Sequence, residues 1–122
     1  MTLLELLKVR GSLLKYKSVA GPEVSFDTKY KIARFLFDTD KDAKFYLESV
    51  ALLEQQYSSR KEEHVDKTKQ AEYESKIEEL LNTETEKTIT FTREELSGFN
   101  MSVDDLICLY NCIKDGEKIE NN

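Results

Sequence analysis

The chain contains few residues of the kinds that perform chemistry, so their spacing decides whether they form a site. Its two cysteines, Cys108 and Cys112, stand four residues apart, and its single histidine, His64, lies far from them in a polar stretch. A zinc site needs about four ligands, so this spacing does not predict one. On a helix the two thiols share a face beside Leu109 and Ile113, where cysteine packs as a small apolar residue. We therefore expect reduced cysteines within a core.

The acidic residues are numerous, but their spacing is typical of surface charge. Adjacent acids such as Asp104 and Asp105 point about 100° apart on a helix, so their carboxylates do not converge on a metal ion or a sugar. The segment that holds Asp38, Asp40 and Asp42 resembles the start of a calcium loop, yet it lacks the glycine and the closing glutamate of such a loop. The four glycines are isolated, so no phosphate-binding loop is predicted either. We expect no catalytic residue, no metal and no cofactor.

Composition points to a helical protein that does not bind nucleic acid. The 122 residues suit one domain, with 34% charged residues, one proline and four glycines. A net charge of −6 disfavours direct contact with nucleic acid or an anionic membrane, which would need clustered lysine and arginine. No apolar run approaches the roughly 18 residues of a membrane span, and the first residues lack the features of a signal peptide. We expect a soluble protein inside a cell.

Apolar residues recur at helical spacing in three stretches. They predict helices over residues 2–16, 27–57 and 71–81. The acidic segment 38–42 interrupts the second stretch: either one long helix passes through it or two helices meet there, and we favour a break. Residues 58–70 are polar and predict a solvated helical face or a mobile connection.

The helix that begins near residue 27 has two candidate apolar rows. Its apolar positions are Tyr30, Ala33 and Phe37, with Ile32 and Leu36 on the adjoining row. We expect these positions to face the core.

The last third of the chain has the clearest sequence signals for where secondary-structure elements begin and end. Ile89 and Phe91 alternate with threonines, which predicts a half-buried strand over 88–92 paired with an extended piece of 17–26. Thr92 begins a capping box, and Ser102 caps a final helix. The expected buried face of that helix is Leu106, Ile107, Tyr110 and Ile113. The predicted fold is α+β and mainly α-helical, with a small two- or three-stranded β element in one domain over 1–116 and a disordered tail over 117–122.

Aromatic residues on the predicted helices are the remaining candidates for binding. Phe45 and Tyr46 are neighbours on a helix, so both cannot face inward fully, and one of them is a candidate exposed anchor for a partner. The nearby Asp38, Asp40 and Asp42 would add charge that tunes association. We take these five residues as the candidate partner-binding site.

The order of these motifs resembles that of a known group of proteins. A leucine-rich helix is followed by SFDTKYKIAR at 25–34, LEQQY at 53–57, ELSGF at 95–99 and MSVDDLI at 101–107. This pattern is similar to that of a widespread group of small proteins from tailed bacteriophages and prophages, largely of unassigned function. The likeness covers nearly the whole chain, and it consists of packing and turn residues. It implies origin and fold, and it carries over no functional residue.

The resemblance and the absence of catalytic motifs favour two functions. The first is a non-enzymatic phage protein in the host cytoplasm that inhibits a bacterial antiviral defence effector such as a basic nuclease, as anti-CRISPR proteins do. The second is a morphogenesis or virion accessory protein that binds structural proteins or forms a homo-oligomer. An enzyme or a nucleic-acid binder is disfavoured.

Overall fold

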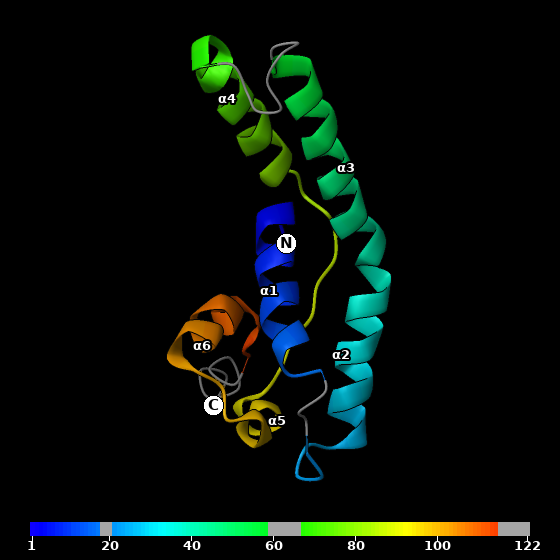
Figure 1. The fold of residues 1–122 in the computed structure, drawn as a ribbon. Helices are drawn as coiled ribbons and strands as arrows, with labels where there is room; N and C mark the ends of the chain where they lie inside the picture. Colours follow the sequence, from blue (N-terminus) through cyan, green and yellow to red (C-terminus); the bar gives the residue numbers. More distant parts are fainter. Residues whose placement is uncertain (18–20, 59–66, 115–122) are drawn as a thin grey trace.

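The computed structural model describes residues 1–17, 21–58 and 67–114 (Figure 1). His64, residues 59–66 of the polar stretch expected over 58–70, and the tail expected over 117–122 lie outside them. In chain order the α-helices and the 3-10 turns are α1 (Leu3–Lys15), α2 (Phe26–Asp38), α3 (Asp40–Tyr57), η1 (Lys67–Lys69), α4 (Gln70–Leu81), α5 (Arg93–Leu96), η2 (Ser97–Phe99), α6 (Val103–Leu109) and η3 (Tyr110–Cys112).

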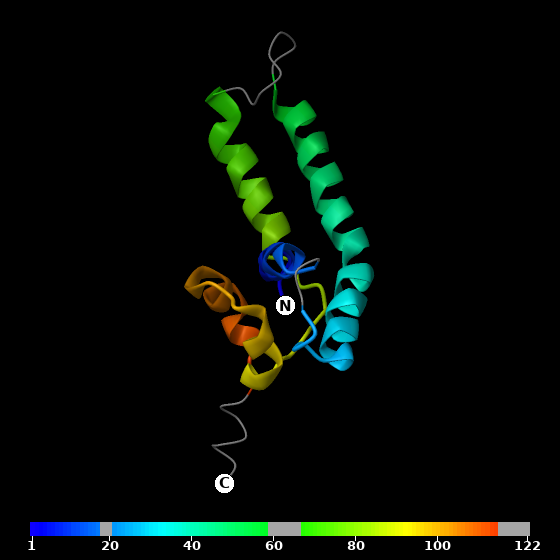
Figure 2. The same ribbon diagram turned by 60° about the horizontal axis from the view of Figure 1, so that its bottom comes forward.

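Helix α1 lies at the centre of the molecule. Helices α5 and α6 lie on one side of it and α2 on the other, as both ribbon views show (Figures 1 and 2). Helix α3 continues the direction of α2 and pairs with α4, so that a helical hairpin projects beyond the rest of the fold. The core therefore gathers around α1.

The sequence of α1 explains its position. Thr2 and Glu5 form a complete capping box at its start, which supplies partners for two otherwise unpaired backbone N–H groups. A row of large apolar side chains then faces the protein interior at helical spacing, and it consists of Leu3, Leu6, Val9 and Leu13. Leu6 and Leu13 are fully buried. The helix expected over 2–16 is confirmed.

Helices α2 and α3 meet at Thr39, so the break expected within 38–42 is confirmed as a single residue. Thr39 has a backbone φ of −101° and ψ of 1°, outside regular helical values. Its N–H and its hydroxyl both donate to the carbonyl of Phe35, at 3.0 Å and 2.7 Å. The buried threonine thus satisfies its own polar groups where the two helices join.

The expected orientation of α2 is wrong in one respect. The structure buries Thr28, Ile32 and Phe35. Tyr30, Ala33 and Phe37, which were expected to face the core, are exposed. Ser25 accepts from the Thr28 N–H at the start of α2, and the Thr28 hydroxyl lies 2.9 Å from the Ser25 hydroxyl. A threonine satisfied in this way can occupy an interior position.

The expected β element is also wrong, because the described residues contain isolated bridges and no strand. The N–H of Phe91 donates to Cys112 O, and the N–H of Lys114 donates to Phe91 O. Cys112 ends a 3-10 turn, so the neighbouring segment offers one bridge and no longer ladder. Residues 18–20 of the segment expected as a partner lie outside the described residues, and its remainder forms a turn between Gly21 and Val24 and then begins α2. The fold is helical in the part of the chain that is described.

The C-terminal helices begin as predicted, but the last one shows a different face. Thr92 and Glu95 form the expected capping box, and Ser102 caps α6. The side chains that α6 and η3 bury are Asp105, Leu109 and Cys112. The expected buried face is wrong, since Leu106, Ile107 and Tyr110 are exposed and Ile113 is partly buried.

Candidate functional site

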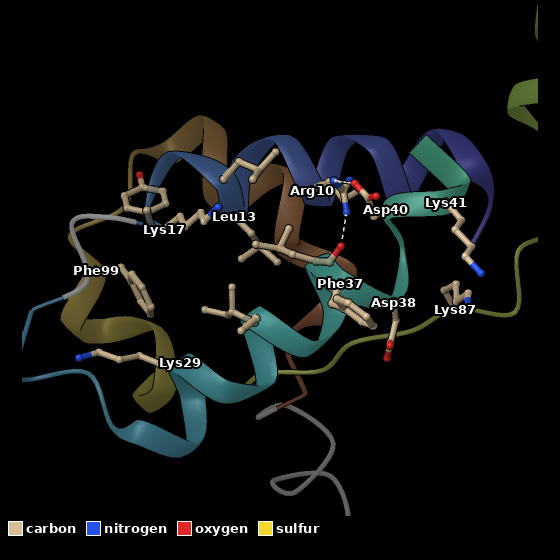
Figure 3. Close-up of a pocket in the computed structure, with 15 residues that line it drawn as sticks. Arg10, Leu13, Lys17, Lys29, Phe37, Asp38, Asp40, Lys41, Lys87 and Phe99 are labelled. Atoms are coloured by element: carbon tan, nitrogen blue, oxygen red, sulfur yellow. Dashed lines mark hydrogen bonds and ion pairs between the residues drawn. The ribbon is translucent and has the colours of Figure 1, made fainter. Parts of the chain in front are cut away.

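A groove of about 840 Å³ runs between α1 and α2 and reaches the start of α3 (Figure 3). Its lining combines apolar side chains with charged ones. The lining residues are Arg10, Leu13, Leu14, Tyr16, Lys17, Lys29, Ile32, Ala33, Leu36, Phe37, Asp38, Asp40, Lys41, Lys87 and Phe99. Because it holds two of the five residues predicted from sequence, this groove is the candidate site.

The apolar part of the groove comes from two helices. Leu13 and Ile32 are buried members of the core, so they form its base. Leu14 on α1 and Phe37 on α2 are exposed, and Phe37 is 81% accessible to solvent. Phe37 and Leu14 therefore add uncovered apolar surface at the edge of the hollow.

The charged part of the groove is mainly basic. Five cationic side chains and two acidic ones line it. Lys17 and Lys29 lie at one end near Phe99, and Lys41 and Lys87 lie at the other end (Figure 3). The whole chain has 24 acidic and 18 basic residues, so this local excess of positive charge opposes the overall balance. The groove is an apolar surface with a cationic rim.

The fifth cation, Arg10, holds the junction of α2 and α3. Its Nη1 donates to the carbonyl of Leu36 and to the hydroxyl of Thr39, each at 2.7 Å. Its Nη2 lies 3.8 Å from Asp40 Oδ1. Arg10 extends from α1 across to the other two helices, so it ties the three together at one end of the groove (Figure 3).

The three aspartates predicted as a charged patch lie around this junction. Asp38 and Asp40 line the groove, and Asp42 is partly buried in the first turn of α3. Asp38 Oδ2 lies 3.6 Å from Arg34 Nε, and Asp40 Oδ2 lies 2.9 Å from Lys44 Nζ. The hydrogen bond from Lys44 holds the pKa of Asp40 below its usual value, and the charge of Arg10 adds to this effect.

The predicted aromatic pair is divided between the interior and the surface. Tyr46 is partly buried and packs against the hydrophobic core, whereas Phe45 is 58% exposed on α3. Neither ring lines the groove. A partner-binding role for these two residues therefore stays a prediction, and the groove is a separate surface.

The sequence reasoning missed the rim of the groove. Lys17, Lys29, Lys41 and Lys87 come from four different places in the chain, so no local motif connects them. The alternation of charges on each helix looked like an ordinary solvated face. The available signal was the second apolar row of α2. A helix with two apolar rows can pack one of them on the core and leave the other exposed to line a groove.

Within the described part of the chain, no group of three or more histidine, cysteine or acidic side chains is placed to hold a metal ion. None of the helices in residues 1–17, 21–58 and 67–114 is both long enough and apolar enough to cross a membrane.

No family model, curated protein or solved structure matches this chain.

Proposed function

We propose that this chain is a non-enzymatic protein that works by binding another protein, and that the groove between α1 and α2 takes an acidic amphipathic helix of that partner. The observation that carries the proposal is the cationic rim around an apolar floor in an acidic chain. Amphipathic helices bind in grooves by placing an apolar row on the floor and polar residues at the rim. Acidic residues on the partner helix would meet the lysines here.

The course of the groove along two helices supports a helical occupant. Its floor is supplied by Leu13 and Leu14 on α1 and by Ile32 on α2, so it runs along two helices. Phe37 stands at its edge as an exposed aromatic side chain, the type that is enriched at binding hot spots. Lys29 and Lys41 lie at opposite ends of the groove, so they would contact carboxylates several turns apart on the partner helix.

The inhibition of an antiviral defence effector is the narrower form of this proposal. The net charge of −6 supports an encounter with a basic effector, because opposite charges speed association. The groove would then receive an acidic helix of the same effector. The expected phage origin supports this form.

Binding can be tested with peptides in solution. The test uses two amphipathic helical peptides of about four turns whose apolar residues are identical. On the polar face, one peptide carries glutamate at the positions where the other carries lysine. Amide chemical shifts of the labelled full chain report where each peptide binds. We expect the acidic peptide to bind along Leu14, Lys29 and Phe37, and the basic peptide to bind at least about tenfold more weakly.

Matched variants connect this binding to the groove. Phe37→Ala should weaken the acidic peptide by about tenfold or more, while Phe45→Ala, which removes an exposed ring outside the groove, should leave it unchanged. Lys29→Glu should weaken it, while Lys76→Glu on α4 should not. The proposal is wrong if both peptides bind equally, or if the groove variants behave as their controls do. Strong binding of dodecanoate with no binding of either peptide would reassign the groove to a small anionic amphiphile.

A further inference from the structure

Helix α6 and the turn η3 expose an apolar ridge on the surface of the molecule. Val103, Ile107 and Tyr110 are 73%, 66% and 74% accessible, and Leu106 beside them is 40% accessible. These positions recur at intervals of three and four residues, so they lie on one side of the helix. A contiguous apolar row of this kind marks an interaction surface more often than a single exposed side chain does.

The ridge faces outward because the opposite side of α6 is fixed to α1. Asp105 is buried there, where it accepts hydrogen bonds from Tyr16 Oη at 2.5 Å and from Lys15 Nζ at 2.9 Å. Leu109 follows one turn later and is fully buried. Rotation of α6 to bury Ile107 would pull the Asp105 carboxylate out of these bonds. The exposed ridge is therefore a fixed property of this fold.

A hollow lies directly beside the ridge. It has a volume of about 740 Å³, and its apolar lining includes Leu96, Met101 and Ile113. Leu106 and Tyr110 belong to both the ridge and the wall of the hollow. The same face thus presents a projecting apolar row and an apolar depression next to it.

We infer that this face binds a second copy of the same chain, with the two α6 helices antiparallel about a twofold axis. In a twofold interface the same patch serves both partners, so a ridge beside a hollow complements itself: each ridge enters the hollow of the other copy. The charges agree with this orientation. Asp104 lies at the start of α6 and Lys114 follows η3, so antiparallel pairing brings the acidic end of one copy to the basic end of the other.

This interface is independent of the groove between α1 and α2, because the groove and the hollow share no lining residue. It is also small, since one short helix and one turn supply most of it. Stable interfaces bury about 800 Å² on each partner, and smaller ones are weak. We therefore expect a dissociation constant on the order of 10 µM.

The oligomeric state of the full chain tests the inference. Sedimentation velocity from about 1 to 500 µM should show a monomer that converts to a dimer as concentration rises. Ile107→Lys should raise the dissociation constant at least about thirtyfold, because two lysines would meet in the apolar contact. Leu52→Lys is the matched control: Leu52 on α3 is also 66% exposed, and its replacement should leave the dimer intact.

Two further measurements keep the result interpretable. Circular dichroism checks that Ile107→Lys is folded, and if it is not, Tyr110→Ser replaces it with the same expected loss of the dimer. Asp104→Asn should weaken the dimer and reduce the dependence of its stability on salt. A wild-type chain that stays monomeric over the whole range overturns the inference, even if it captures a different protein through Ile107. A dimer unaffected by the folded ridge variant, or more sensitive to Leu52→Lys, overturns it equally.

Discussion

Replacing Arg10 by alanine should loosen the junction between α2 and α3 and lower the free energy of unfolding. The guanidinium donates to Leu36 O and to Thr39 Oγ1, each at 2.7 Å, and its side chain is only 12% accessible to water. Thr39 keeps its own hydrogen bond to Phe35 after the change. The loss therefore falls mainly on the carbonyl of Leu36 and on the packing of the arginine stem.

The magnitude follows mainly from the hydrogen bond to the Leu36 carbonyl. A hydrogen bond to a charged group contributes about 1.5–3 kcal/mol. Water can reach part of the vacated site and recover some of that energy, so we expect a net loss of about 2–3 kcal/mol for Arg10→Ala. In a domain of this size such a loss lowers the melting temperature by about 10 °C. Arg10→Lys should lie between the wild type and Arg10→Ala, because an ammonium cannot reproduce the forked donor geometry of a guanidinium.

Urea unfolding followed by far-ultraviolet circular dichroism measures these differences. Lys44→Ala is the control, because it removes an exposed cation that also pairs with Asp40 and should change stability little. The reasoning about the junction is refuted if Arg10→Ala costs no more than Lys44→Ala. The intermediate stability expected for Arg10→Lys is refuted if this variant is as unstable as Arg10→Ala, since a positive charge without the forked donors would then contribute nothing.

Two further predictions concern ionisable groups. Hydrogen bonds from Tyr16 and Lys15 lower the pKa of Asp105 from 3.8 to about 2, so its stabilising effect is present above pH 3.8 and is lost as the pH falls toward about 2. The difference in urea midpoint between the wild type and Asp105→Asn should be large at neutral pH and should shrink toward zero as the pH falls from 3.8 to about 2. A difference that does not change with pH would contradict this. Burial raises the pKa of the Cys112 thiol, so a thiol reagent should modify the partly exposed Cys108 first, and equal rates would refute this.

Local signals in the sequence predicted the starts of helices well. Thr92 with Glu95 forms the expected capping box, which needs only four consecutive residues to be recognised, and Ser102 caps α6 as predicted. The break at 38–42 was also visible as a change in local polarity. Helix starts and breaks of this kind depend on residues that are neighbours in the chain, so they can be predicted from one sequence alone.

The orientation of α6 could not be predicted in the same way. Counting apolar residues favours burial of Ile107 and Tyr110, and that count ignores what Asp105 meets in the fold. Its partners, Lys15 and Tyr16, are 90 and 89 residues away. The cationic rim of the groove has the same origin in distant segments, so its lysines looked like ordinary surface charge.

The segment 88–92 shows where a correct pattern leads to a wrong element. Ile89 and Phe91 are buried as their alternation predicts, while Thr90 between them is exposed. A strand also needs a partner with free backbone groups along its length. Here the Thr90 carbonyl accepts from Lys31 Nζ at 2.8 Å instead. Burial could be inferred from the sequence, and pairing could not.

The single-residue junction at Thr39 makes α3 a lever whose fulcrum lies beside the groove. Helix α3 has 18 residues, so its far end is about 27 Å from the junction. A change of about 10° at Thr39 would move that end, and the α4 hairpin with it, by about 5 Å. Arg10, which lines the groove, also holds the angle between α2 and α3. A ligand in the groove that shifted Arg10 would therefore change this angle slightly and displace the far end of α3 and α4 by several ångströms.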